Sequence, residues 1–179
     1  MEKRILIAMF LILSACPFSY AEGWPTKPFE SVVVTTAPTG STTTTTINDG
    51  KGHVRIESKT GANKSVVLMD YPKKESIVLM DAQKMAMKNK LTSSEDNNGT
   101  KGKDLGKKVI NGHPCHGELF EQGGVKTEVW TGEDINSMVQ TITITPQGKT
   151  VTNLKSYSAN PPAMPSFAIP TGYKVISTK

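Results

Sequence analysis

Two nearly identical apolar segments constrain the fold more than any other feature of this sequence. Residues 65–70 read Ser-Val-Val-Leu-Met-Asp, residues 76–81 read Ser-Ile-Val-Leu-Met-Asp, and a five-residue link with one proline joins them. Short apolar runs bounded by turn residues are typical of strands, so the pair predicts a β-hairpin. Successive side chains of a strand point to opposite faces, which makes both faces of this hairpin apolar. Each face therefore needs a cover, which can be the core, a second layer, a ligand or a partner.

The rest of the chain after residue 21 favours antiparallel β structure. Helical periodicity is almost absent, whereas short β-branched or alternating stretches recur between Gly, Asn and Pro turn signals. Residues 92–106 are polar and rich in Gly and Asn, which predicts a mobile loop. Residues 160–170 contain four prolines and are expected to cross the sheet in extended form without joining it. The predicted strands are residues 29–37, 41–48, 53–58, 65–70, 76–81, 84–88, 107–110, 115–121, 126–130, 138–145, 150–157 and 173–176.

The first 21 residues have the pattern of a bacterial signal peptide. A short cationic start is followed by an apolar run from Ile5 to Leu13 and by small residues before position 22. The run is shorter than the ~20 residues of a membrane-spanning helix. We therefore expect residues 22–179 to form a single β-rich domain in the periplasm. The alternative is a membrane-anchored lipoprotein, because residues 13–16 resemble a lipobox and Cys16 would then carry the lipid.

Composition and spacing argue against several functions. The formal net charge is +5, but Arg55 is the only arginine after residue 21, which disfavours specific nucleic-acid recognition. Cys115 is the only cysteine after the predicted leader, so no intrachain disulfide framework is expected. Cys115 and His116 are adjacent on one predicted strand and point to opposite faces, where they cannot form a nucleophile–base pair. The sequence predicts a protein that is not an enzyme and needs no cofactor.

The doubly apolar hairpin is the candidate binding surface. One face carries Val66, Leu68, Ile77 and Leu79, and the other carries Val67, Met69, Val78 and Met80. On a curved sheet one set would line a concave surface, which Met85 and Met87 would extend. Methionine suits a surface that accepts variable acyl chains, because its side chain is flexible and polarizable. The alternative interpretation is that both sets only pack, as core and underside.

A second hypothesis is a copper site. His113, Cys115 and His116 lie close together in sequence, and thiolate and thioether ligands select Cu(I). These three residues are weak candidates, since adjacent strand positions diverge and the sequence offers no second Cys/His cluster to complete a tetrahedral site. The favoured interpretation of these residues is a turn histidine, a half-buried cysteine and a surface histidine.

Several motifs together resemble a family of uncharacterised exported bacterial domains. They are Gly112-His113-Pro114-Cys115-His116-Gly117-Glu118-Leu119, then Thr127-Glu128-Val129-Trp130, the twin strands ending in Met85-x-Met87, and Phe167-x-Ile169-Pro170-x-Gly172-Tyr173. That family is similar in turn to the LolA/LolB-type half-barrels, curved antiparallel sheets that carry lipoproteins or lipids across the periplasm. The resemblance implies a LolA-like fold and a hydrophobic ligand or lipidated partner. A structural or protein-interaction envelope module without a ligand remains the alternative.

Overall fold

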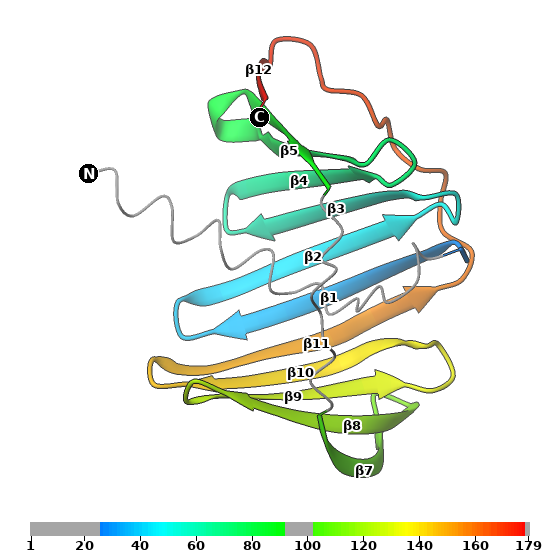
Figure 1. The fold of residues 1–179 in the computed structure, drawn as a ribbon, viewed down its shortest axis with the longest axis vertical. Helices are drawn as coiled ribbons and strands as arrows, with labels where there is room; N and C mark the ends of the chain where they lie inside the picture. Colours follow the sequence, from blue (N-terminus) through cyan, green and yellow to red (C-terminus); the bar gives the residue numbers. More distant parts are fainter. Residues whose placement is uncertain (1–25, 92–101, 178–179) are drawn as a thin grey trace.

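The computed structural model describes residues 26–91 and 102–177 and shows one open sheet of 12 strands. The predicted leader and Cys16 lie outside these residues. The expected curved antiparallel sheet of half-barrel type is confirmed (Figure 1). Its strands are β1 (Phe29–Ala37), β2 (Gly40–Asn48), β3 (His53–Thr60), β4 (Asn63–Asp70), β5 (Glu75–Met80), β6 (Met85–Lys90), β7 (Lys103–Ile110), β8 (His113–Gln122), β9 (Val125–Gly132), β10 (Ser137–Thr145), β11 (Gly148–Ser158) and β12 (Lys174–Ser177).

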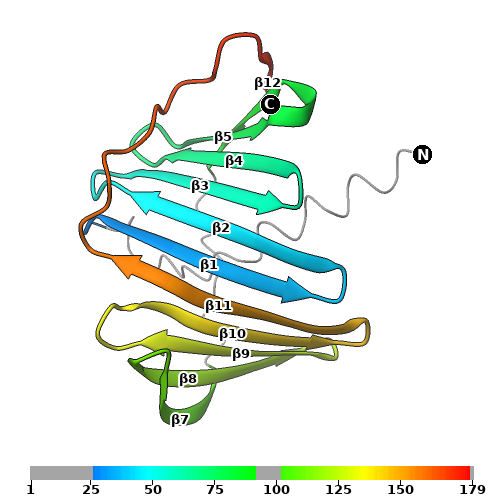
Figure 2. The same cartoon turned by 180° about the vertical axis from the view of Figure 1, so that it is seen from behind.

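The topology joins two meanders at the centre of the sheet. The strand order is β12-β6-β5-β4-β3-β2-β1-β11-β10-β9-β8-β7, so the central contact is the antiparallel pair of β1 and β11. β12 pairs in parallel with β6 at one edge, and β1 to β6 lie between it and β11, so the chain needs a long connection from β11 to β12. Residues 159–173 make this connection and are called the crossing segment below. Figures 1 and 2 show it running past β2 to β5 towards the far edge of the sheet.

Short turns set the register of most neighbouring strands. The β7–β8 turn places Asn111 and Gly112 at φ values of 51° and 86°, the left-handed pair that a two-residue hairpin requires. The single helical element in the described ranges is η1, a three-residue 3-10 helix at Asp81–Gln83 between β5 and β6. No helix among the described residues has the length and hydropathy to cross a membrane.

Two separate clusters of buried residues lie along the one sheet, in addition to the buried side chains Phe29, Ile47, Val54 and Ile56 on β1 to β3. The first, on β4 to β6, contains the buried residues Val66, Leu68, Leu79 and Ala86. The second, on β8 to β11, contains Cys115, Trp130, Val139 and Leu154. Residues 26–91 and 102–177 form no second layer over this sheet, so they build separate clusters along it rather than one central core.

The predicted loop at 92–106 is shorter at its end than expected. β7 begins at Lys103, so residues 103–106 extend the edge strand, and Asp104 and Gly106 take up a register shift there. The Asp104 carboxylate accepts a 2.6 Å hydrogen bond from the Gly106 N–H, which supports this irregular start. Residues 92–101 lie outside the described residues.

Candidate functional site

The twin apolar strands and the crossing segment form one packed unit. Val66, Leu68 and Leu79 are buried, and Leu68 has no exposed surface at all. Cross-strand pairing joins Val66 to Leu79 and Leu68 to Ile77, which puts four of the predicted binding residues on one face. The crossing segment covers this face with the half-buried side chains of Phe167, Ile169 and Tyr173. The chain's own C-terminal part therefore provides the cover that the sequence required on this side.

Polar contacts attach the crossing segment at several points. The Tyr173 hydroxyl donates to Asp81, and the Lys84 ammonium lies 5.3 Å from the centre of the Tyr173 ring. The ring of Phe167 meets His53 edge to face, with centroids 5.2 Å apart. These contacts are side-chain contacts, so the segment lies over the sheet without adding a strand to it until β12.

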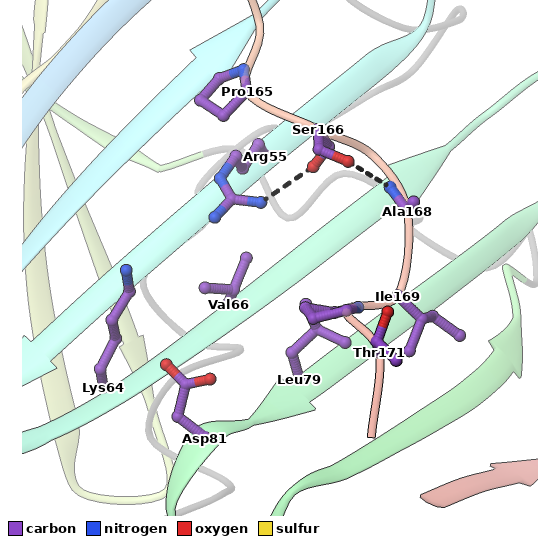
Figure 3. Close-up of a pocket in the computed structure, with 11 residues that line it drawn as sticks. Arg55, Lys64, Val66, Leu79, Asp81, Pro165, Ser166, Ala168, Ile169 and Thr171 are labelled. Atoms are coloured by element: carbon purple, nitrogen blue, oxygen red, sulfur yellow. Dashed lines mark hydrogen bonds between the residues drawn. The ribbon is translucent and has the colours of Figure 1, made fainter. Parts of the chain in front are cut away.

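A cavity of about 460 Å³ remains between the sheet and the crossing segment (Figure 3). Its size is within the ~300–1,000 Å³ range of small-molecule sites. Val66 and Leu79 lie at its base, and Ile169 on the crossing segment is among the residues that line it. Pro165 and Pro170 of the crossing segment form part of the cavity wall. Proline has no backbone N–H, so the segment cannot fill this space by pairing with the sheet at these positions. The lining residues are Arg55, Lys64, Val66, Leu79, Asp81, Pro165, Ser166, Ala168, Ile169, Pro170 and Thr171.

A charged group borders one side of this cavity. The Glu57 carboxylate lies 3.0 Å from Lys64 Nζ, 3.5 Å from Arg55 Nη2 and 3.8 Å from Lys59 Nζ. Burial by itself would raise the pKa of Glu57, but the hydrogen bond from Lys64 and the surrounding positive charge hold it below its usual value. The Arg55 guanidinium also donates to the Ser166 carbonyl at 3.3 Å, which links the charged group to the crossing segment.

A second cavity of about 360 Å³ lies on the other side of Ala168, which lines both. Here His53 Nδ1 is 2.6 Å from Asp49 Oδ2, and Lys73 Nζ is 2.7 Å from Asp70 Oδ2. Burial would raise the pKa of Asp70, but the hydrogen bonds from Lys73 outweigh it and hold the pKa below the usual range. The polar groups in this cavity therefore already satisfy one another.

Met85 and Met87 lie on the other face of the sheet from the four residues above. Ala86 is the residue of β6 that pairs with Leu79, whereas Met85 pairs with Met80 and Met87 with Val78. The two methionines thus extend the second apolar face, with Val67 and Met69. The six predicted binding residues do not form one surface, and their role in binding stays a prediction.

The copper candidates are held apart from one another. Cys115 is buried and its thiol donates to the His113 carbonyl at 3.3 Å. The His113 ring lies 2.7 Å from Asp134, and His116 Nε2 is 3.8 Å from Asp104. Across the described parts of the chain, no three His, Cys, Asp or Glu side chains converge to hold a metal ion. The geometry gives the copper hypothesis no support.

No local sequence pattern predicts the polar residues of the cavity. Arg55, Lys64 and Asp81 come from β3, β4 and η1, and only the fold brings them to one cavity. The sequence contains a weak signal for the apolar contacts of the crossing segment. Phe167 and Ile169 are two residues apart in an extended stretch, so their side chains project to the same side.

Comparison with solved structures shows the same fold in proteins with very different sequences. An uncharacterised conserved protein from Thermus thermophilus matches with a TM-score of 0.64 and 12% identity, over 86% of this chain and 91% of that one. A chain of the MucA/MucB complex of Pseudomonas aeruginosa matches with a TM-score of 0.57 and 14% identity, over 86% of this chain and 59% of that one.

Comparison by sequence identifies a family. A search of the curated proteins finds no match to the chain. A family model described as a domain of unknown function, DUF4412, matches residues 31–150, which run from β1 into β11. This match confirms the expected membership of a family of uncharacterised domains: the chain belongs to the DUF4412 family.

Proposed function

We propose that this protein is an exported cell-envelope protein that binds a hydrophobic ligand between its curved sheet and the crossing segment. The observation that carries the proposal is the cavity of about 460 Å³ whose base is Val66 and Leu79. An apolar group that leaves water and enters this space gains about 25 cal/mol per Å² of its own apolar surface, because Val66 and Leu79 offer it an apolar base. The proposal assigns no chemical step to the site, so the protein acts by binding.

A protein partner is the second candidate. MucB, whose structure alone matches with a TM-score of 0.51, forms a complex with MucA. The present chain has a second apolar face on β4 to β6, formed by Val67, Met69, Val78 and the two methionines of β6. A lipidated or apolar partner could use this face, whereas a small ligand fits the cavity.

The location follows from the predicted leader. We place the protein in the periplasm, with a lipid anchor at Cys16 as the alternative. Mass spectrometry of the chain expressed from its full sequence in a bacterial host separates these forms. A denatured mass that starts at Glu22 supports the periplasmic form, and a mass that starts at a lipidated Cys16 overturns it. Extra mass in the native spectrum alone would be a ligand that copurifies.

The binding proposal is tested with the uncharged fluorescent probe N-phenyl-1-naphthylamine. The wild-type protein should bind it, and Ile169→Lys should weaken binding about tenfold or more, because the new ammonium enters the apolar wall of the cavity. Ile144→Lys is the matched control, since Ile144 is 46% exposed on β10 and far from the site. Circular dichroism checks that both variants fold. The proposal fails when the wild type does not bind the probe or when both variants bind it equally.

A further inference from the structure

The charges around the main cavity are unequal in number. Two cations, Arg55 and Lys64, line it, and both also contact the Glu57 carboxylate beside it. One carboxylate, Asp81, lines it and accepts a hydrogen bond from the Tyr173 hydroxyl. Two positive groups and one negative group therefore line the cavity. A group with this excess attracts an anion, and the attraction is stronger beside an apolar surface than in bulk water.

Arg55 is the group best placed to bind that anion. Its side chain is 15% exposed, and its contacts with Glu57 at 3.5 Å and with the Ser166 carbonyl at 3.3 Å are both long. A guanidinium has five N–H donors and binds carboxylate or phosphate in a two-pronged geometry. Lys64, at 37% exposure, lines the same cavity and can add a second charge.

The cations and the apolar surface belong to the same cavity. Figure 3 shows Arg55 and Lys64 on one side of Val66, with Leu79 and Ile169 on the other. A ligand that satisfies both sides has an anionic group at one end and an apolar chain at the other. A neutral lipid would leave Arg55 and Lys64 sharing the Glu57 carboxylate, and a cationic amphiphile would be repelled by the two cations.

We propose that the cavity selects an amphiphile with an anionic head group, carboxylate or phosphate, bound by Arg55 and Lys64, and an alkyl chain over Val66 and Leu79. This inference rests on the proposed function and adds the class of ligand to it. The crossing segment contributes to anion binding through Ser166. The Arg55 guanidinium would donate hydrogen bonds to both the Ser166 carbonyl and the anion.

The experiment measures displacement of N-phenyl-1-naphthylamine by four amphiphiles that each contain a twelve-carbon chain. These are dodecanoate, dodecyl phosphate, dodecanol and dodecyltrimethylammonium, each below its micellar concentration or, for dodecanol, below its solubility limit. The two anions should displace the probe at about tenfold lower concentration than the other two, as expected for one additional charge-assisted hydrogen bond. A lower concentration for the phosphate than for the carboxylate assigns the head group to a phospholipid, and the reverse order assigns it to a fatty acid.

Three variants test which residues cause the preference for anionic compounds. Arg55→Met and Lys64→Met keep a flexible, unbranched side chain without the charge, and each should remove most of the anion preference while the neutral probe still binds. Lys59→Met is the matched control, because Lys59 contacts Glu57 but does not line the cavity. Should Arg55→Met fail to fold, Lys64→Met still tests the proposal, since Lys64 is more exposed.

The outcomes separate the two proposals. Equal displacement by all four compounds, or an anion preference that both cavity variants retain, overturns the head-group inference and leaves ligand binding intact. Loss of the preference in Lys59→Met as well as in the cavity variants also overturns it, because long-range charge would then be the cause. Absence of probe binding in the wild type overturns both proposals together.

Discussion

Replacing Gly117 by alanine should destabilise the second core cluster through a single contact. Gly117 on β8 pairs directly with Trp130 on β9. A methyl group at this position would lie 2.5 Å from Cζ3, 2.6 Å from Cη2 and 2.7 Å from Cε3 of the Trp130 ring. Carbon atoms that are not bonded normally stay about 3.5 Å or more apart. Either the ring or strand β8 must therefore move.

The ring has little freedom to move. Trp130 is 5% exposed and packs in the cluster with Cys115 and Val139. Its indole N–H donates to Glu128 at 3.2 Å, and Lys108 Nζ lies 3.5 Å from the centre of the ring. Overpacking of this kind costs about 1–3 kcal/mol, and we take the upper value for a clash with a fixed ring. Alanine recovers up to about 1 kcal/mol because it restricts the unfolded strand more than glycine does.

The expected net loss of stability is about 2 kcal/mol, equivalent to about 4–8 °C in Tm for a chain of this size. Urea unfolding followed by far-UV circular dichroism measures it in the wild type, Gly117→Ala, Trp130→Leu and the double variant. Trp130→Leu removes the ring atoms, so Gly117→Ala should be neutral or stabilise the protein by up to about 1 kcal/mol in that background. Equal costs in the two backgrounds, within about 0.5 kcal/mol, would refute the contact as the cause.

Three further predictions concern other parts of the molecule. Phe167→Ala should cost about 1–3 kcal/mol, as a half-buried aromatic in the cover of the first cluster, and should speed amide exchange in the crossing segment; unchanged exchange would contradict this role. The Cys115 thiol should react with a disulfide reagent far more slowly in the folded protein than in urea, because burial raises its pKa and excludes the reagent; equal rates would show an open site. Asp70→Asn should lower Tm at pH 7, and the difference should shrink below about pH 4. The pKa of Asp70 is lower in the folded protein than in the unfolded chain. The stabilisation by Asp70 is therefore complete above the unfolded-state pKa and is lost as the pH falls through the folded-state pKa. A Tm difference that stays constant with pH would contradict the role of the Asp70–Lys73 pair.

The strands could be predicted because their signals are local. Alternation, β-branched residues and glycine-containing turns act within a few residues, and the apolar character of β4 and β5 on both faces follows from covalent geometry alone. The motif that contains Gly117 and Trp130 could be identified in the sequence, but the sequence does not explain why a glycine occurs at position 117. The structure supplies that reason, since the glycine makes room for the indole ring on the next strand.

The faces of β6 could not be predicted in the same way. Residues 81–84, which include η1, connect β5 to β6, and this connection brings Ala86 rather than a methionine opposite Leu79. A change of one residue in such a connection moves every side chain of the following strand to the other face. The sequence therefore predicts which residues alternate on β6, but the turn decides which of them meet the first cluster.

The position of the crossing segment could not be predicted from the sequence pattern either. This segment contributes both to the stability of the first cluster and to the proposed binding site. An extended chain can place Phe167 and Ile169 on the first cluster, but without backbone pairing it contacts the sheet only through alternate side chains. The same cover that buries Leu68 leaves the cavity beside Val66 and Leu79. A ligand in this cavity would replace contacts that a regular second layer would make. Binding and attachment of the segment therefore share the same side chains, and any ligand that fits the cavity should also hold the crossing segment in place.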